Sequence, residues 1–453
     1  MFKLETIALM AAVSPVTASE YYGLNAGAPV YGGNIFVTPT QAAKFAETGT
    51  NSLRINFRLD PQGGNTTWNS TILAQYDQVI ANANAAGIEV LGLFSNETAI
   101  NGSGQGTWNT DPNGNGTNSY VNSFVSNATM LANRYKNTIK TWEVWNEPNA
   151  WTNPNYANDP GNAGGTYILP KNYARLLANT YTSMNSSNLF SQYGVSLVSG
   201  GLFAHDIGGS FTHSMDYMQQ VYSQPAIWNS FLSTTGRKYP WDDFGYHMYI
   251  KQGETVTAAN LNSYLNQVRS VQATNQDTSD VMITEWGWQV VNNNTQTFQK
   301  NQMATAYNLF ESKDYISGTY WYQWTDDVTG NWGLVDINGN KRLSYYEFQT
   351  RNANAEPDPE PLPGDLDGSG AVGQNDLNRV LARWGTNVTA GDWFLGDPNG
   401  DGFVGQGDLS IVLAAWGNVA PPVTAVPEPA SIALLSLGIV GVAIAARRRR
   451  KAA

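Results

Sequence analysis

No cysteine occurs in this chain of 453 residues, and only three histidines are present. The lack of cysteine excludes disulfides, thiolate nucleophiles and cysteine-based zinc or iron–sulfur sites. Three histidines nearly exclude a three-histidine metal site, and no G-x-S-x-G segment signals a serine hydrolase. Acidic residues outnumber basic ones, with 36 Asp and Glu against 25 Lys and Arg. The net charge of −11 argues against a nucleic-acid partner, because such binding needs a basic surface.

Apolar and aromatic residues are abundant by contrast. Hydrophobic residues make up 42% of the chain and charged residues only 13%, which predicts a large buried core. The 15 tryptophans and 23 tyrosines have flat apolar faces that suit the C–H faces of sugars. Core packing is the alternative role for most of these rings.

The first residues have the order of a secretory signal. Lys3 precedes an apolar run over residues 7–13, and small residues at 16–18 offer a cleavage site. We therefore expect residues 1–18 to be a signal peptide, with a buried first helix as the alternative.

The C-terminal segment, residues 426–451, combines three features. Val426-Pro427-Glu428-Pro429 leads into an apolar run over 430–446, which four arginines and Lys451 follow. The run is somewhat shorter than the ~20 residues that span a bilayer comfortably, and the basic cluster would stay inside. The segment resembles the PEP-CTERM sorting signal of certain bacteria, which implies recognition and removal by an exosortase. A retained C-terminal hydrophobic transmembrane helix is the alternative. Either way we expect an exported bacterial protein of the cell envelope, cell surface or extracellular space.

Residues 352–363 form a linker rich in proline and glutamate, with no apolar period. Residues 364–418 beyond it contain an internal repeat with a spacing of 32 residues. Oxygen-bearing side chains occupy loop positions one, three, five and twelve of each copy: Asp365, Asp367, Ser369 and Asp376, then Asp397, Asn399, Asp401 and Asp408. Such loops wrap a hard cation, and Gly370 and Gly402 allow the sharp turn.

Each acidic loop precedes one helical pattern that ends in Trp-Gly. The duplicated arrangement resembles a type I dockerin, a small all-α module. The resemblance implies two structural Ca²⁺ ions, one per loop, and a cohesin-type protein as a possible partner.

The segment 20–351 alternates short apolar runs with amphipathic stretches, which predicts an α/β fold. We expect strands at 22–26, 52–57, 89–95, 141–147, 195–200, 244–250, 281–286 and 318–324. We expect helices at 76–86, 120–135, 173–184, 261–274 and 302–310. Eight such strands favour a (β/α)8 TIM barrel, although an open doubly wound sheet has the same local pattern.

Two glutamates end predicted strands, where a barrel carries its reactive groups. Glu147 follows T-W-E-V-W-N, and Glu285 lies in V-M-I-T-E-W-G. Hydrolysis of a glycosidic bond needs two carboxyl groups, one to protonate the leaving oxygen and one to attack or to activate water. W-N-E-P followed by I-T-E-W-G resembles glycoside hydrolase clan A, notably families five and thirty-nine. The resemblance implies a retaining enzyme with Glu147 as acid/base on strand four and Glu285 as nucleophile on strand seven.

Five further residues match positions of that clan. The resemblance implies that Arg54 supports the nucleophile and that Asn146 holds a sugar hydroxyl. It also implies substrate contacts for His247, Tyr249 and Trp321, the last as a sugar platform. Plain packing, core hydrogen bonding or ion pairing is the alternative for each.

Three other acidic residues lie on or near these strands, and for them the sequence predicts a position but no catalytic role. We expect Glu143 to point into a lower layer of the barrel. Asp326 and Asp327 follow the eighth strand, and we expect them on a solvated loop, with a position along the cleft as the alternative.

The implied chemistry requires the two glutamates to differ in protonation, with Glu285 ionised near Arg54 and Glu147 protonated at rest. We expect no cofactor for catalysis and a polysaccharide or oligosaccharide as substrate, without a preferred glycan or an endo or exo mode. The alternative function is a non-catalytic glycan-binding surface protein that is tethered through its dockerin-like module.

Overall fold

The computed structural model describes residues 21–60, 64–99, 107–110, 118–150, 166–204, 214–250, 254–291, 295–327, 330–351, 362–367, 370–388 and 392–419. The expected signal peptide, most of the linker, Ser369 and the segment 426–451 lie outside these residues. Within the described part of the chain, no helix is long and apolar enough to cross a membrane.

Eight parallel strands close into a barrel in the order β1-β4-β5-β6-β7-β8-β9-β10, with β10 returning to β1. The strands are β1 (Tyr21–Asn25), β4 (Ser52–Asn56), β5 (Glu89–Phe94), β6 (Thr141–Asn146), β7 (Ser196–Phe203), β8 (Asp243–Met248), β9 (Asp280–Trp286) and β10 (Ile316–Trp321). The closed order confirms the TIM barrel over the open sheet, and β6 and β9 are the fourth and seventh barrel strands.

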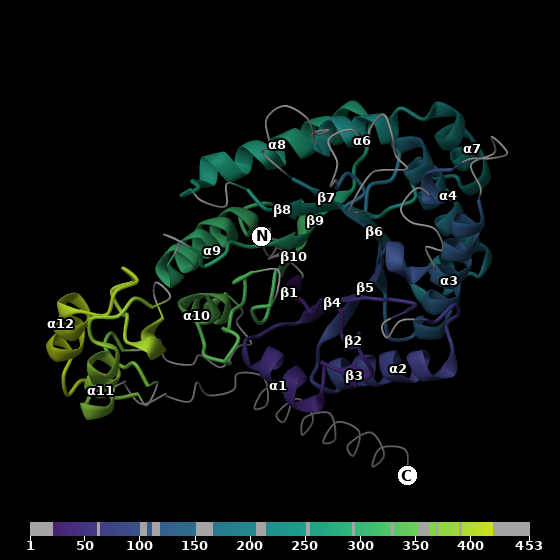
Figure 1. The fold of residues 1–453 in the computed structure, drawn as a ribbon. Helices are drawn as coiled ribbons and strands as arrows, with labels where there is room; N and C mark the ends of the chain where they lie inside the picture. Colours follow the sequence, from purple (N-terminus) through teal and green to yellow (C-terminus); the bar gives the residue numbers. More distant parts are fainter. Residues whose placement is uncertain are drawn as a thin grey trace, which may run out of the picture.

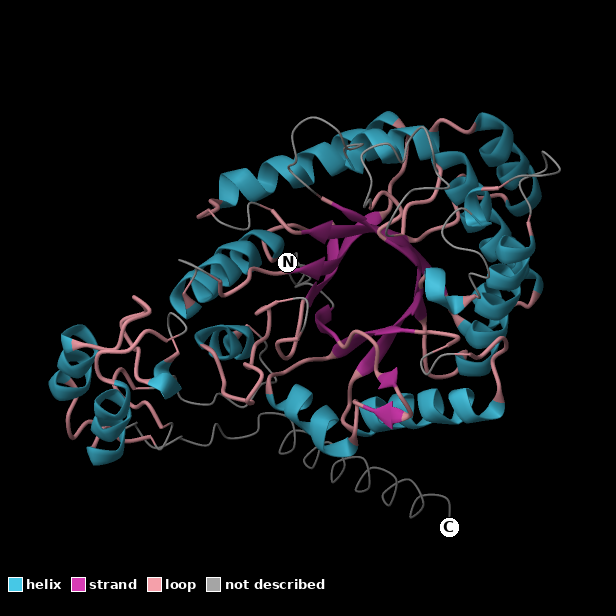
Figure 2. Ribbon diagram, viewed as in Figure 1, coloured by secondary structure: helices cyan, strands magenta, loops and turns pink. Residues whose placement is uncertain are grey.

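Helices surround the ring of strands, as Figures 1 and 2 show. They are α1 (Pro39–Glu47), α2 (Ser70–Ala85), α3 (Ser119–Tyr135), α4 (Pro170–Ser186), α5 (Leu189–Tyr193), α6 (Ser214–Tyr222), α7 (Pro225–Thr235), α8 (Ala258–Thr274), α9 (Gln296–Phe310) and α10 (Leu343–Thr350). The βα loops contain further short elements. These are the 3-10 turns η1 (Asn96–Thr98) and η2 (Thr107–Asn109) and a hairpin of β2 (Val30–Tyr31) with β3 (Asn34–Ile35).

Local sequence explains where several of these helices begin. The Asn69 side chain accepts hydrogen bonds from two backbone N–H groups at the start of α2. Thr257 and Asn260 form a capping box on α8. Proline occupies the first turn of α1, α4 and α7, where its missing N–H has no cost. These signals fix the helices that hold the barrel strands in place.

Most of the aromatic residues fill the core. Among the residues that the structure describes, six tryptophans are fully buried: Trp108, Trp142, Trp145, Trp286, Trp288 and Trp321. Inside the barrel, Leu91, Val198, Met282 and Tyr320 form a separate apolar cluster. This cluster closes the N-terminal end of the barrel, where the Ser52 and Tyr320 hydroxyls share a 2.9 Å hydrogen bond.

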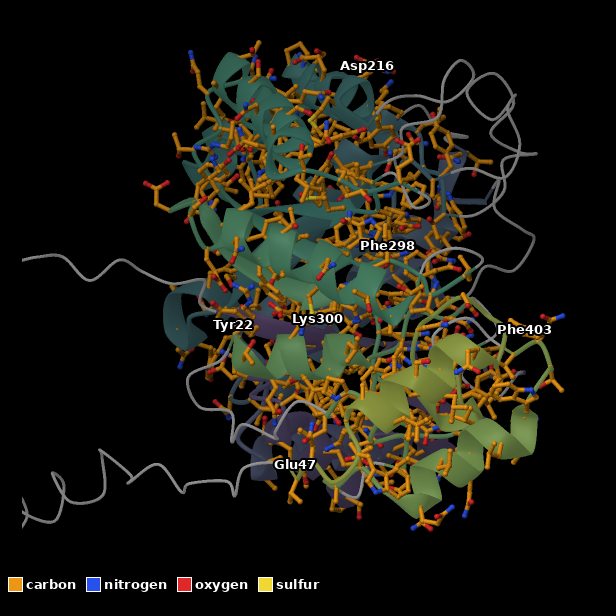
Figure 3. All side chains as sticks on the ribbon, turned by 90° about the vertical axis from the view of Figure 1, so that its left-hand side faces the viewer. Tyr22, Glu47, Asp216, Phe298, Lys300 and Phe403 are labelled. Carbon is orange, nitrogen blue, oxygen red and sulfur yellow. The ribbon has the colours of Figure 1, made fainter. Side chains whose placement is uncertain are left out.

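Residues 362–419 have a small core of their own around Val380, Val404 and Val412. Two helices, α11 (Gln374–Arg383) and α12 (Gln406–Ala414), and the turn η4 (Trp393–Leu395) build it. Phe403 projects at its surface and is 46% exposed (Figure 3). The acidic loops lie just before α11 and α12, as the repeat predicts.

Candidate active site

Glu147 directly follows β6 on an unusual stretch of backbone. Trp145 has φ of 82° and Glu147 has φ of 47°, both in the left-handed region that bulky residues rarely adopt. The buried Trp145 ring anchors this stretch, because its Nε1 donates to the Thr166 carbonyl at 2.8 Å. Glu147 N donates to the Gly201 carbonyl of β7 at 3.1 Å. Strain held by such contacts is typical of functional sites.

Glu285 lies near the end of β9 and accepts three hydrogen bonds. Asn25 Nδ2 donates to its Oε1 at 2.8 Å, and Arg54 Nη1 donates to the same oxygen. The Tyr249 hydroxyl donates to Oε2 at 2.7 Å. Only 11% of the side chain is exposed. A carboxylate held by one cation and two neutral donors is fixed in one orientation, as an attacking group requires.

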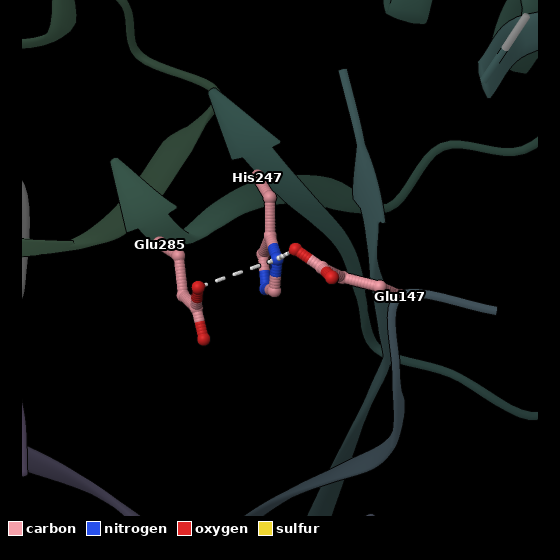
Figure 4. Close-up of side chains that lie close together, drawn as sticks. All are labelled: Glu147, His247 and Glu285. Carbon is pink, nitrogen blue, oxygen red and sulfur yellow. Dashed lines mark hydrogen bonds and ion pairs between the residues drawn. The ribbon is translucent and has the colours of Figure 1, made fainter. Parts of the chain in front are cut away.

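His247 of β8 lies between the two glutamates, as Figure 4 shows. Its Nδ1 is 2.9 Å from Glu147 Oε1 and 3.7 Å from Glu285 Oε2, while Nε2 is 3.8 Å from Glu143 Oε1. Burial lowers the pKa of His247, but the Glu285 charge and the neighbouring Glu143 and Glu147 carboxyl groups raise it to about 9. The imidazole is therefore protonated at neutral pH and donates toward Glu147.

Glu143 and Arg54 form the floor of the site. Both are buried, and Arg54 Nε donates to Glu143 while its Nη2 donates to Asn146 Oδ1 at 2.8 Å. Thr284 Oγ1 and Gly201 N also donate to Glu143, at 2.9 and 2.8 Å. Burial alone would raise the pKa of Glu143, but the Arg54 charge and the nearby His247 imidazole lower it to about 2. Glu143 thus lies in the lower layer that the sequence suggests, without an exposed surface.

Two residues that complete the site carry little sequence signal. Asn25 ends the first barrel strand, and only its position after an apolar run hints at a role. Gly201 lies in β7, where an added Cβ would be 2.2 Å from the His247 ring and 2.6 Å from Thr284 Oγ1. Glycine at this position therefore makes room for His247. The Gly200-Gly201 pair inside an apolar strand is the one signal that could have indicated a close approach.

Six of the seven predicted catalytic and substrate-binding residues come together in this way, but Trp321 does not. Trp321 has no exposed surface and packs edge-on against Trp286, with ring centroids 4.9 Å apart. A fully buried ring cannot stack on a sugar, so the expectation for Trp321 needs correction. The next residue, Tyr322, is part-exposed and lies beside Tyr249, with centroids 6.0 Å apart.

Trp332 is a second aromatic residue at the site that the sequence did not indicate. Its ring lies 5.2 Å from Tyr249 and 5.8 Å from Tyr322, centroid to centroid. The loop that carries it is pinned at its base by a buried ion pair, because both Arg342 Nη atoms donate to the Asp326 carboxylate. Asp326 is only 6% exposed, so the expected solvated loop is wrong for this residue. Asp327 is exposed, as expected.

Glu147, His247 and Glu285 could also serve as metal ligands on distance alone. One atom from each lies within 4.8 Å of the other two. A divalent cation at this position would have to displace the proton that the raised pKa of His247 retains.

The two acidic loops of residues 362–419 repeat each other in geometry. Gly370 N donates to Asp365 Oδ2 at 2.7 Å, and Gly402 N donates to Asp397 Oδ2 at 2.8 Å. In each loop three carboxylates offer oxygens within 4.8 Å of one another: Asp365, Asp367 and Asp376, then Asp397, Asp401 and Asp408. Burial and the Asp397 charge raise the pKa of Asp408. The cluster of hard oxygen donors fits a calcium ion.

Comparison with solved structures places the barrel among glycoside hydrolase folds. A GH5-4 broad specificity endoglucanase from Clostridium longisporum matches with a TM-score of 0.51 and 15% identity, over 75% of this chain and 97% of that one. The GH5-4 endoglucanase from Clostridium acetobutylicum gives a TM-score of 0.50 and 17% identity, over 73% and 96%. At this identity the likeness establishes the (β/α)8 fold.

A family 39 glycoside hydrolase from Bacteroides cellulosilyticus WH2 also matches, with a TM-score of 0.46 and 17% identity over 73% of this chain. The match spans 63% of that protein's length. A search of curated proteins finds no match to this sequence. Residues 425–450 match the PEP-CTERM protein-sorting motif, which indicates a bacterial protein directed to the cell envelope.

Proposed function

We propose that the chain is a retaining glycoside hydrolase that cleaves β-glycosidic bonds of a plant- or algal-type polysaccharide, or of its oligosaccharides, by double displacement. One observation carries the proposal: oxygens of Glu147 and Glu285 lie within 4.8 Å of each other. Carboxyl groups of retaining enzymes are about 5–5.5 Å apart, whereas inverting enzymes need roughly 6.5–9.5 Å to admit a water.

In the first step a Glu285 oxygen attacks the anomeric carbon, and the bond from that carbon to the leaving oxygen breaks. Glu147 transfers its proton to the leaving oxygen, so the aglycone departs as a neutral alcohol. Glu147 Oε1 is held by His247 Nδ1, which leaves Oε2 to carry the proton. The product of this step is a glycosyl ester of Glu285.

In the second step Glu147, now a carboxylate, takes a proton from water while the water oxygen attacks the anomeric carbon. The ester bond to Glu285 breaks, which restores both carboxyl groups. Arg54, Asn25 and Tyr249 stabilise the Glu285 carboxylate as it leaves. Asn146 is oriented by Arg54 through its Oδ1, so its Nδ2 faces a sugar hydroxyl.

Two variants separate these roles. Glu285→Ala should abolish turnover of every substrate, because no covalent intermediate can form. Glu147→Ala should retain activity on aryl glycosides whose leaving group needs no proton, and azide should restore its rate through a β-glycosyl azide product. Glu89→Ala, which removes an exposed carboxylate at the opposite end of the barrel, is the matched control.

The measurement is kcat/KM on aryl glycosides and defined β-linked oligosaccharides. Wild-type protein that binds glycans but hydrolyses none would contradict the proposal and favour the non-catalytic glycan-binding alternative. Equal loss in both glutamate variants, without azide rescue, would contradict the assigned roles.

We propose further that residues 364–418 bind one Ca²⁺ ion per loop. Asp365, Asp367, Ser369 and Asp376 would hold the first, and Asp397, Asn399, Asp401 and Asp408 the second. Calcium would neutralise the clustered carboxylates and thereby stabilise the small core. A cohesin-type protein is the proposed partner of this module.

We propose that an exosortase-type enzyme removes the C-terminal segment, as the matched motif supports. Before that step the segment would hold the protein in the membrane. Intact mass of the protein recovered from its native envelope should lack the four terminal arginines. Arginines still attached in the recovered protein would make the segment a permanent anchor.

A further inference from the structure

A charged and aromatic cluster that the proposed chemistry does not use lies beside the candidate active site. It consists of Tyr31, Asn56, Arg58 and Glu97, and we call it the rim cluster. Asn56 ends β4, Arg58 follows that strand, Glu97 follows β5 in η1, and Tyr31 belongs to the β2–β3 hairpin after β1. All four therefore come from the C-terminal ends of barrel strands, the end at which TIM barrels bind substrates.

Asn56 connects the rim cluster to the catalytic residues. It lies two residues after Arg54 on the same strand, so both side chains point to the same face. Arg54 contacts Glu285, and Asn56 lies one step nearer the mouth of the barrel. Asn56 Nδ2 donates to Glu97 Oε2 at 3.0 Å. A ligand that extends from Glu285 toward this side would meet Glu97 next.

The position of Glu97 is fixed by several hydrogen bonds. Its N–H donates to Ser95 Oγ at 3.1 Å, and its carbonyl accepts from Leu59 N at 2.8 Å. Its Oε1 is 2.8 Å from Arg58 Nη2. The carboxylate is thus held in place although 39% of the side chain is exposed. A preorganised carboxylate and guanidinium side by side can accept from and donate to adjacent sugar hydroxyls.

Two polar atoms of the cluster lack hydrogen bonds within the described part of the chain. Asn56 Oδ1 and Arg58 Nε are both buried and have no partner there. Both atoms are closed off from solvent, so a bound sugar would instead reach the exposed parts of the cluster, the Glu97 carboxylate and the Tyr31 ring. Tyr31 adds an apolar surface, since its ring is 58% exposed and lies 5.8 Å from the Arg58 guanidinium carbon. Together these groups have the chemistry of a sugar subsite.

We propose that the rim cluster binds a second sugar ring of a chain-like substrate, with Glu97 and Arg58 holding vicinal hydroxyls and Tyr31 stacking on the ring face. The inference rests on the proposed glycosidase function and narrows it. The substrate is an oligosaccharide or polysaccharide, and a single sugar with a small aglycone reaches only part of the binding surface.

The test compares two substrate types in the same variants of the full chain. Glu97→Gln removes the charge and keeps the shape, and Tyr31→Ala removes an exposed ring. The readout is the ratio of kcat/KM on β-linked oligosaccharides to kcat/KM on the matching p-nitrophenyl β-monoglycoside. Asp77→Asn is the control, because Asp77 and Arg134 form a comparable exposed ion pair on α2 and α3.

We expect each rim-cluster variant to lower this ratio by about tenfold, through a higher KM for the oligosaccharide, as loss of one sugar contact predicts. Asp77→Asn should leave the ratio unchanged. An unchanged ratio in both rim variants would overturn the inference. A ratio that falls equally in the Asp77 variant would also overturn it, because a general stability effect would then explain the loss.

Thermal unfolding of the same variants separates a structural ion pair from a binding one. Exposed ion pairs contribute little to stability, so the unfolding temperature should change little. A wild-type protein that hydrolyses neither substrate type would contradict the glycosidase proposal itself. Hydrolysis with no dependence on the rim cluster contradicts only this inference.

Discussion

His247 lies within 4 Å of carboxyl oxygens of three glutamates, and its protonation links stability to pH. Its pKa is raised from 6.5 to about 9, despite the opposing effect of burial, by Glu285, Glu143 and Glu147. A raised pKa means that the folded state binds the proton more tightly than the unfolded chain. The stabilisation of the folded state by the His247 proton is therefore fully present below pH 6.5, and it is lost as pH rises through about 9.

This linkage predicts how a His247→Gln variant differs from the wild type. Below pH 6.5 the free energy of unfolding of the variant should be lower by up to about 3 kcal/mol. This figure is the free energy that corresponds to the shift of the His247 pKa from 6.5 to about 9. The difference in unfolding free energy should shrink between pH 6.5 and 9, as the wild type loses its proton. Denaturant unfolding of both proteins across this range checks the prediction. A difference that stays constant with pH would show that His247 acts by packing alone.

Strand β7 contributes to the site through Gly201, whose lack of a side chain leaves space for the His247 ring. Gly201 lets His247 lie directly against the strand while its own N–H donates to Glu143. Gly201→Ala should push the imidazole away from Glu147 Oε1 and lower kcat/KM. The overpacking should also cost about 1–3 kcal/mol of stability.

Val198→Ala in the same strand is a suitable comparison for that variant. Val198 is buried in the apolar cluster of the barrel, which does not include His247. It should lose a similar amount of stability while keeping its kinetic constants. Kinetics and unfolding are measured on both variants. If both variants lose activity in proportion to stability, Gly201 has no specific role in the site.

The strand elements show why sequence could predict part of this site. Runs such as V-M-I-T-E in β9 are apolar because the barrel buries them, and the polar residue that ends each run lies at the mouth. This reasoning located Glu147 and Glu285. The same pattern gave a wrong prediction for Trp321 at the end of β10. The Trp321 ring is buried, whereas the next residue, Tyr322, is part-exposed. Register at a strand end depends on neighbouring strands, which a local pattern does not contain.

Other features depend on contacts across long stretches of chain. Trp332 reaches Tyr249 only because the Asp326–Arg342 pair folds its loop back. Gly201 matters only because β8 places His247 against it. Neither relation leaves a periodic pattern in the sequence. The acidic repeat, in contrast, is visible at once, since its spacing is local.

At the scale of the whole molecule, the chain combines a barrel with a smaller unit that has a separate core. Separate cores predict separate responses to calcium removal. Chelator should lower the unfolding temperature of a minor calorimetric transition, and added calcium should restore it. The major transition and the glycosidase activity should stay unchanged, because the barrel strands do not include the acidic loops.

Asp408→Ala should abolish the calcium response of the minor transition, because it removes a buried carboxylate that we propose as a calcium ligand. Asp216→Ala, an exposed aspartate on α6, should leave it intact. Calorimetry of the full chain with and without calcium provides the measurement. If chelator leaves the unfolding temperature of the minor transition of the wild type unchanged, calcium binding by residues 364–418 is refuted.

We propose that Glu285 attacks the anomeric carbon directly, and the stereochemistry of the first product tests this step. Proton NMR of the anomeric region, recorded within minutes of mixing enzyme with a β-linked substrate, identifies the product before it mutarotates. Two displacements at one carbon restore its configuration, so we expect a β-anomer as the first product. An α-anomer formed first would mean that water attacks in a single step, and it would contradict the role of Glu285 as nucleophile.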